Sequence, residues 1–199
     1  RHVPEAGKRW DELHLAFAAE TVQLEYLLGR QRRCAAADRR MSSEFERVFE
    51  VGPVFRADPS FTSRHMTEFT GLDFEMSWIN DHHDVMDFIE GWLNHIYTKV
   101  KEKHGEQIKE LLGVEITVPE LPFPRIPMAE AIKIVRDMGY DLPVEKTHDL
   151  DPGGERTIAK YVKEKYGHDF VFITDWPIEA RPFYHMRKPE DEKLTRSFD

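Results

Sequence analysis

The sequence predicts an α+β fold in which an antiparallel or mixed sheet is flanked by helices. Residues 47–57 and 67–79 are two stretches with regularly placed apolar residues, and the polar loop DPSFTSRH lies between them. This arrangement predicts a β-hairpin with a long loop. Apolar residues then recur at helical spacing over 80–103, and shorter helices and strands alternate after it. The length, 199 residues, suits one domain or one domain with an appendage.

The composition is that of an ordinary globular protein, with 40% hydrophobic and 33% charged residues. The formal net charge of −9 argues against a protein that coats nucleic acid non-specifically. No apolar run reaches the roughly 18 residues that cross a bilayer, and RHVPEAGKRW lacks the apolar core of a signal peptide. The single cysteine, Cys34, excludes an internal disulfide and a cysteine-based zinc site. We therefore expect a cytoplasmic protein without a membrane partner.

The first 44 residues differ in character from the rest. Residues 11–28 have an irregular helical pattern that ends near Gly29, and the arginine- and alanine-rich stretch GRQRRCAAADRRM follows. This basic stretch is either a solvated helix or linker, or a surface that faces RNA. We treat residues 1–44 as a divergent N-terminal segment, helical and then basic, ahead of a domain over 45–199.

The first strand of the hairpin alternates between polar and apolar sides. One side of it carries Val48, Glu50, Gly52, Val54 and Arg56, and the other carries Phe49, Val51, Pro53 and Phe55. A proline inside a strand favours an edge position or a bulge. Arg56 is then either solvated, paired with Glu75 across the hairpin, or part of a binding site.

The helix after the hairpin is predicted from a capping residue and a regular apolar side. Asn80 or Asp81 can cap it, and it should run to about Lys103. The sequence HHD at its start, His82 to Asp84, invites a metal site. Because neighbouring helical positions diverge by about 100°, we expect these side chains not to converge on one ion, and we predict no metal site.

The second half of the chain should alternate helices and short strands. Residues 114–126 are proline-rich and extended, and Pro127 suits the first turn of a helix that ends before Gly139. A further helix is predicted over 154–166, with short strands at 169–174 and at ARPFYHM.

The hairpin combines charges of both signs within twenty residues. Arginines can grip phosphates through two parallel hydrogen bonds, and carboxylates can hold an ammonium or a metal. Such a mixture suits a zwitterionic small molecule together with a nucleotide. The sequence contains neither GxGxxG nor GxxxxGK[ST], so arginines on strands would have to hold that nucleotide. The charged residues are Arg56, Asp58, Arg64, His65, Glu68, Asp73 and Glu75.

The stretch GPVFRADPSFTSRHMTEFTGLDFEM resembles the second signature motif of class II aminoacyl-tRNA synthetases, in the form found in aspartyl-tRNA synthetases of the archaeal and eukaryotic type. The segment RTIAKYVKEKYGHDFVFITDWPIEARPFYHM is similar to a later segment of the same family. The resemblance implies that residues 45–199 are a partial class II catalytic domain, with an antiparallel sheet flanked by helices and incomplete at its C-terminus.

The resemblance assigns phosphate contacts to the loop end of the hairpin. Arg56 would be the catalytic residue, because it would bridge the α-phosphate of ATP and the carboxylate of the amino acid and stabilise charge that builds on phosphorus. Ala57 would lie beside it in the ATP site. Asp58, where the family usually has glutamate, would lie near the adenosine and the terminal nucleotide of tRNA. Arg64 and His65 would hold the β- and γ-phosphates.

The resemblance assigns the remaining contacts to the second strand. Met66 would border the ATP site, and Phe69 would stack on adenine. Asp73 would bind the α-ammonium of the amino acid, and the form LDFEM favours aspartate over asparagine.

The implied reaction is ATP-dependent formation of aspartyl-adenylate and transfer of the aspartyl group to the 3′ end of tRNA. ATP and Mg²⁺ are the expected cofactors; L-aspartate and tRNA-Asp, or also tRNA-Asn, are the expected partners, in a homodimer. The family's QSPQ-like segment and first motif do not occur in residues 1–44, and its metal-binding glutamate and third motif are expected after this chain, which then holds about half a site. Two alternatives are a tRNA-independent asparagine synthetase of the same fold and a non-catalytic paralogue that binds tRNA or a nucleotide.

Overall fold

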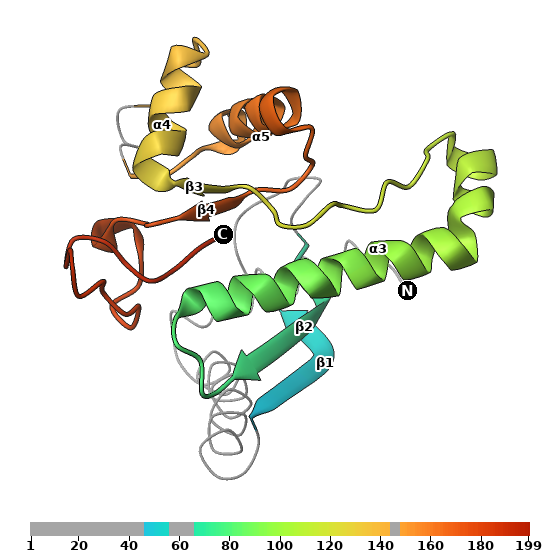
Figure 1. Ribbon diagram of the computed structural model, residues 1–199, viewed down its shortest axis with the longest axis horizontal. Coiled ribbons are helices and arrows are strands. Elements are labelled where there is room, and N and C mark those ends of the chain that lie inside the picture. Colours follow the sequence, from blue (N-terminus) through green and yellow to red (C-terminus); the bar gives the residue numbers. More distant parts are fainter. Residues whose placement is uncertain (1–45, 56–65, 144–147) are drawn as a thin grey trace. The chain divides into compact units, whose positions relative to one another are not determined.

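The computed structural model describes residues 46–55, 66–143 and 148–199, and the chain divides into two units, residues 1–78 and 79–199. Figure 1 shows the elements in chain order. The predicted helix over 11–28 and the basic stretch after it lie outside the described residues. We use "the hairpin" for the two strands of the first unit and "the helical unit" for residues 79–199.

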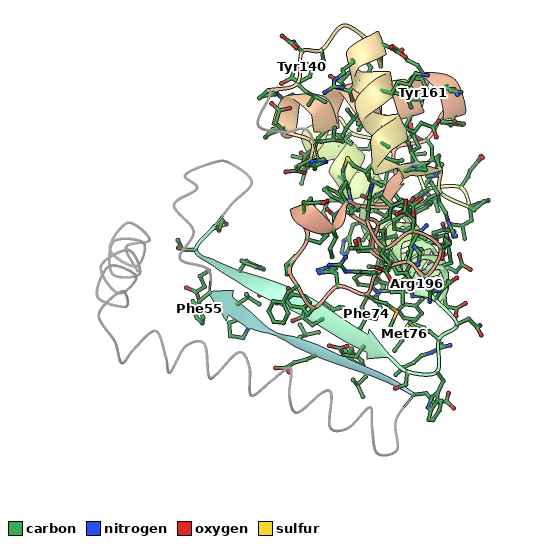
Figure 2. The ribbon with its side chains drawn as sticks, turned by 90° about the vertical axis from the view of Figure 1, so that its left-hand side faces the viewer. Phe55, Phe74, Met76, Tyr140, Tyr161 and Arg196 are labelled. Carbon is green, nitrogen blue, oxygen red and sulfur yellow. The ribbon has the colours of Figure 1, made fainter. Side chains whose placement is uncertain are left out.

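The hairpin consists of strand β1, Arg47–Phe55, and strand β2, Glu68–Met76. The strands are antiparallel, and their register is continuous from Arg47 opposite Met76 to Phe55 opposite Glu68. Figure 2 shows Phe55 and Met76 at opposite ends of the ribbon. The predicted hairpin is confirmed. The continuous register leaves no bulge at Pro53, which faces Thr70 in a two-stranded sheet where each described strand is an edge.

Alternation along both strands gives the hairpin one apolar face, as predicted. The apolar face carries Phe49, Val51 and Pro53 from β1 with Leu72, Phe74 and Met76 from β2. Directly opposite residues share a face, so Phe49 lies across from Phe74 and Val51 across from Leu72. Cross-strand pairs of aromatic and branched side chains are the contacts that stabilise a two-stranded ribbon.

Helix α3, His82–Leu112, opens the helical unit. Asp81 caps it as predicted, because its side chain accepts a hydrogen bond from the backbone N–H of His83 at 2.7 Å. The predicted end near Lys103 is wrong by nine residues. The helix continues through Ile108, Leu111 and Leu112 until Gly113, whose φ of 67° closes it in the left-handed conformation.

Two short parallel strands form the centre of the helical unit. Strand β3, Arg125–Pro127, pairs with strand β4, Phe172–Thr174. Helix α4, Met128–Asp137, follows β3 directly, and helix α5, Pro152–Tyr166, ends at Gly167 with a φ of 70°. The predicted helices and their glycine ends are confirmed, although α5 begins two residues before the predicted start.

The core of the helical unit lies on both faces of the β3–β4 ribbon. Ile126 and Ile173 pack with apolar residues of α4 and α5, among them Val135 and Val162. Phe172 faces the other way and packs with Met86 of α3 and with Phe123. Neighbouring strand residues point to opposite faces, so a strand of three residues can serve two clusters. Figure 1 shows α4 and α5 together beside β3 and β4.

The predicted strand at ARPFYHM is wrong. The short 3₁₀-helix η2, Ile178–Ala180, is followed by a turn in which the N–H of His185 donates to the carbonyl of Pro182. Phe183 is 95% exposed and Tyr184 is 72% exposed. The aromatic composition favours a strand, but Pro182 supplies no N–H for a ladder. Among the described residues, no helix is both long enough and apolar enough to cross a membrane.

Candidate functional site

The candidate site is the polar face of the hairpin, which is the face opposite the apolar one. Its cross-strand pairs are Val48 with Glu75, Glu50 with Asp73, Gly52 with Gly71, and Val54 with Phe69. These eight residues share one side because strand positions alternate and directly opposite positions project together. The face therefore changes in character along the ribbon, from carboxylates through bare glycines to an aromatic ring.

The acidic end of the polar face places two carboxylates against each other. Glu50 and Asp73 are direct Cα partners, and both are exposed. Like charges directly opposite each other in a sheet are destabilising, so this pair does not contribute to the stability of the hairpin through charge. A positively charged ligand group would be attracted to both side chains. The arrangement is suited to binding an ammonium.

The middle of the polar face has no side chains. Gly52 and Gly71 lie opposite each other, and a Cβ added to Gly71 would lie 2.6 Å from Cγ2 of Val54. A side chain at position 71 would therefore collide with its neighbour unless Val54 moved. Two glycines in strand interiors weaken a ribbon, and they often mark a place where a ligand approaches the backbone closely.

The far end of the polar face carries the ring of Phe69, which is 37% exposed. Phe69 and Asp73 are four residues apart on one strand, which corresponds to about 13 Å. Aromatic faces stack on nucleobases in a way that tolerates any base. The polar face can therefore accept an elongated ligand with a flat ring at one end and an ammonium at the other.

The structure thus brings two of the predicted site residues together on one face, Phe69 and Asp73. Met66 precedes β2 and is 66% exposed. The predicted residues Arg56, Ala57, Asp58, Arg64 and His65 lie outside the described residues.

The strand register does not support the alternative in which Arg56 forms an ion pair with Glu75. Glu75 lies opposite Val48, whereas Phe55, the described neighbour of position 56, lies opposite Glu68. Seven positions, about 23 Å along a strand, separate Val48 from Phe55.

Reasoning from the sequence missed three residues of the polar face, Glu50, Gly52 and Gly71. The alternation in β1 already put Glu50 and Gly52 on the polar side with Arg56. Their pairing with Asp73 and Gly71 depends on the register across the loop, which the sequence pattern alone does not fix. A hairpin register would have identified them.

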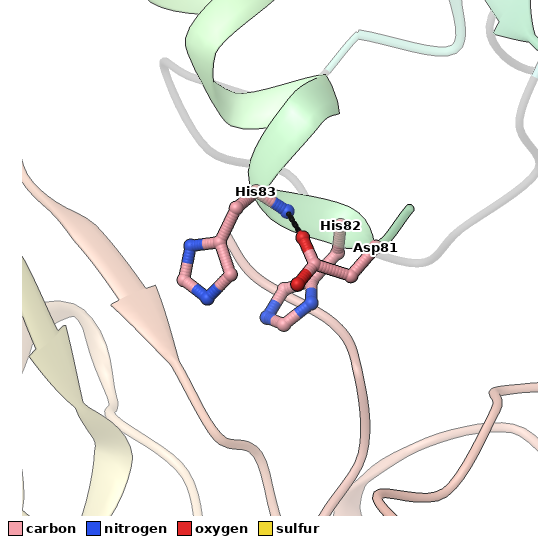
Figure 3. Close-up of side chains that lie close together, drawn as sticks. All are labelled: Asp81, His82 and His83. Atoms are coloured by element: carbon pink, nitrogen blue, oxygen red, sulfur yellow. Dashed lines mark hydrogen bonds between the residues drawn. The ribbon is translucent and has the colours of Figure 1, made fainter. Parts of the chain in front are cut away.

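A second group of polar side chains lies at the start of α3, in the helical unit. One donor atom each from Asp81, His82 and His83 lies within 4.8 Å of the others, and Figure 3 shows the Asp81 carboxylate beside the two imidazole rings. This group is not the triplet His82 to Asp84, because Asp81 takes part in it and the Asp84 carboxylate instead accepts a hydrogen bond from the backbone N–H of Asn80. The rings of His82 and His83 lie closer together than the expected divergence, with centroids 4.5 Å apart. Asp81 has extended backbone dihedrals, φ −158° and ψ −172°, so it precedes the helix and the rotation per helical residue does not apply to it.

The family model for "tRNA synthetases class II (D, K and N)" matches residues 37–199 of this chain. The aspartate–tRNA(Asp/Asn) ligase of Aeropyrum pernix is 44% identical over 155 residues, which cover 77% of this chain and 35% of that protein. The aspartate–tRNA(Asp) ligase of Thermoplasma volcanium is 42% identical over 159 residues, with 80% and 35% covered. The chain thus spans about a third of the length of the curated relatives that it matches.

Solved structures of the same group resemble the chain in fold. The aspartyl-tRNA synthetase of Entamoeba histolytica matches with a TM-score of 0.69 and 33% identity, over 77% of this chain and 32% of that one. An asparaginyl-tRNA synthetase of Pyrococcus horikoshii, complexed with asparaginyl-adenylate, matches with a TM-score of 0.69 and 26% identity, over 82% and 36%. The match of the family model over most of the chain establishes that the chain belongs to the class II tRNA synthetases (D, K and N).

Proposed function

We propose that this chain carries part of the catalytic domain of an aspartate–tRNA ligase. The observation that carries the proposal is the row on the polar face, where Phe69, Gly71 and Asp73 follow one another on one strand. The row suits a ligand with a nucleobase and an amino-acid ammonium, such as an aminoacyl-adenylate. The reaction joins L-aspartate and ATP into aspartyl-adenylate with release of pyrophosphate, and the aspartyl group then passes to the 3′ end of tRNA.

Each residue of the polar face would have a separate task. Asp73 would bind the α-ammonium of aspartate, and Glu50 opposite it would add a second negative charge. Phe69 would stack on adenine, and the bare backbone at Gly52 and Gly71 would leave room for the ribose and phosphate between them. This positioning holds the reacting carboxylate near the α-phosphate, which accounts for much of the rate enhancement in such reactions.

The phosphate contacts are those that the resemblance to class II synthetases implies. Arg56 would stabilise the charge that develops on the α-phosphate as the aspartate carboxylate attacks. Arg64 and His65 would bind the outer phosphates, with Ala57 and Asp58 near the adenosine. Mg²⁺ supplies charge neutralisation on the phosphates when it is bound with ATP.

Substrate choice and assembly belong to the same proposal. The form LDFEM favours aspartate as the amino acid. The similar proteins are named as ligases for tRNA(Asp) or for tRNA(Asp/Asn), and tRNA of one or both kinds would be the partner here. A cytoplasmic homodimer is the expected assembly.

Calorimetric binding of a non-hydrolysable aspartyl-adenylate analogue tests the proposal, with the asparaginyl analogue measured in parallel. Asp73→Asn keeps the size of the side chain and removes its charge, and it should weaken binding of the aspartyl analogue by roughly tenfold to a hundredfold. Glu68→Gln is the matched control, because Glu68 projects from the other face of the same strand. Arg56→Ala should weaken binding by a similar factor through loss of the phosphate contact.

Three results would contradict the proposal in different ways. A preference for the asparaginyl analogue would identify an asparagine enzyme. Equal losses in Asp73→Asn and Glu68→Gln would show that the polar face is not the site. No binding by a chain with native circular dichroism would indicate a non-catalytic paralogue or a site that needs further segments, and ammonia-dependent formation of asparagine without tRNA would identify the asparagine synthetase alternative.

A further inference from the structure

The start of α3 places a carboxylate and two imidazoles close together. One donor atom of each of Asp81, His82 and His83 lies within 4.8 Å of the others. Figure 3 shows the hydrogen bond from the backbone N–H of His83 to one oxygen of Asp81, with both rings beside that carboxylate. Because Oδ1 of Asp81 accepts this bond, Oδ2 is the oxygen available to a ligand.

His82 is the unusual member of the group. Its side chain belongs to a residue that is only 9% exposed, and neither ring nitrogen has a hydrogen-bond partner among the described residues. A buried polar atom without a partner is destabilising, and buried polar groups in native proteins nearly always find partners. The ring is tilted against His83, with centroids 4.5 Å apart, and stacks near Phe198 at 6.4 Å. A ligand that accepts a lone pair from the imidazole would remove part of this cost.

The donor atoms of the group suit a cation. His82 is buried and neither ring nitrogen has a partner among the described residues, so no hydrogen-bond donor occupies the nitrogen lone pair. Neutral imidazoles and a carboxylate are the ligands that Zn²⁺ and similar divalent transition metals prefer.

His83 is held by a neighbouring arginine. Nη1 of Arg125 lies 2.9 Å from Nδ1 of His83, and a guanidinium can only donate, so Nδ1 accepts and the ring proton is on Nε2. To bind a metal through Nε2, His83 must move that proton to Nδ1 and release Arg125. Arg125 would keep its two carboxylate partners, Asp87 and Glu90.

The surrounding charges are mixed. Lys188 and Arg196 add positive charge, whereas Asp175 adds negative charge, and Lys188 is already paired with Asp175. The group therefore gains no strong attraction for cations from its neighbours. Selectivity has to come from the donor atoms themselves, which favours a metal with high affinity for imidazole over Mg²⁺ or Ca²⁺.

We propose that Asp81, His82 and His83 form a binding site for a divalent transition-metal ion of the Zn²⁺ class. His82 and Oδ2 of Asp81 are the first two ligands, His83 is the third after its release from Arg125, and water completes a tetrahedral shell. Zn²⁺–ligand distances of about 2.0–2.2 Å place donor atoms roughly 3.4 Å apart. Small rotations of the three side chains are therefore needed to shorten the distances between their donor atoms. This site is separate from the residues of the proposed ligase reaction.

Calorimetric titration of the full 199-residue chain with Zn²⁺ tests the site, together with the visible absorption spectrum of the Co²⁺ form. Asp81→Asn preserves the helix cap, since asparagine caps as well as aspartate, but it removes the charged ligand. His82→Phe removes the buried ligand together with its two unpartnered nitrogens. His104→Phe is the control for histidine loss, because His104 is exposed on the same helix.

Each ligand variant should weaken Zn²⁺ binding by about tenfold or more and abolish a tetrahedral Co²⁺ spectrum, whereas His104→Phe should leave both unchanged. The chain has ten histidines, so binding as such is not sufficient. The proposal would be overturned if Asp81→Asn and His82→Phe weakened Zn²⁺ binding no more than His104→Phe does. It would also be overturned if the wild-type chain did not bind Zn²⁺. Asp81→Asn decides the question if His82→Phe does not fold.

Discussion

The hairpin and the helical unit place their large apolar residues in opposite ways. In the hairpin, Phe49 is 75% exposed, Val51 is 55% exposed and Leu72 is 42% exposed. In the helical unit, the side chains of Met128, Val135 and Val162 are almost completely buried. A two-stranded ribbon has too little surface to bury its own side chains, and alone it is at best marginally stable. Helices on both faces of a ribbon provide such a core.

This difference indicates that the hairpin mainly serves ligand binding and that the helical unit mainly provides stability. The hairpin carries the predicted ligand contacts Phe69 and Asp73, and Glu50 lies directly opposite Asp73. The helical unit carries an ion pair with one buried partner, capped helices and two apolar clusters. Substitutions in the helical unit should therefore change the free energy of unfolding, and substitutions on the polar face of the hairpin should change ligand affinity.

The largest expected effect is at the ion pair between Arg125 and Glu90. Nη2 of Arg125 lies 3.1 Å from Oε1 of Glu90, whose side chain is 6% exposed. Arg125→Met leaves that carboxylate buried without its cation and should lower the free energy of unfolding by about 3–5 kcal/mol. Chemical denaturation measures this loss. The double variant Arg125→Met with Glu90→Leu should recover much of it, and equal losses in both variants would contradict the role of the pair.

The next effect compares apolar truncation in the two regions. Met128 is completely buried, so Met128→Ala should cost about 2–5 kcal/mol. Phe49→Ala removes a side chain that is 75% exposed and should change the free energy of unfolding of the helical unit by less than about 0.5 kcal/mol. Trp176 is buried in that unit, so its fluorescence, measured in a background where the other three tryptophans are replaced by Phe, reports the unfolding of the unit. Comparable losses of unfolding free energy in Met128→Ala and Phe49→Ala would contradict the difference in burial between the two regions.

The third prediction concerns the bare middle of the polar face and depends on the proposed function. Gly71→Val places a side chain where the ligand should lie and against Cγ2 of Val54. It should reduce the binding free energy of the aspartyl-adenylate analogue by about 1–3 kcal/mol. Thr70→Val, on the other face, is the control. Retained affinity in Gly71→Val would show that no ligand covers the glycines.

The smallest effect is a pH dependence in the helical unit. Asp151 caps α5, and the N–H of Gly154 and then the hydroxyl of Tyr140 donate to it, which lowers its pKa. A lowered pKa means stability that is present above the unfolded value of about 3.9 and is lost as pH falls through the folded value. Denaturation between pH 7 and 3 should show a shallower acid loss in Asp151→Asn, which keeps a capping side chain. If the unfolding free energy of Asp151→Asn fell with pH as steeply as that of the wild type, Asp151 would not contribute to the pH dependence.

Local rules in the sequence were sufficient for several elements. The apolar alternation predicted both strands of the hairpin, and Asp81, Gly139 and Gly167 marked helix boundaries through capping and left-handed backbone. The resemblance to class II synthetases rested on residue order in two segments, the hairpin and residues 156–186, and the family match bears it out. These features depend on residues close together in the chain, so a reader of the sequence can find them.

Tertiary contacts decided the rest. The opposition of Glu50 with Asp73 and of Gly52 with Gly71 follows from the strand register, and the pairing of β3 with β4 joins residues 47 positions apart, such as Arg125 and Phe172. The aromatic stretch around Phe183 looks like a strand, but it has no ladder partner and turns instead. The grouping of Asp81 with His82 and His83 depends on where the helix begins. The sequence determined which residues are available for chemistry, and the fold decided which of them face one another, because facing depends on register and packing rather than on local preference.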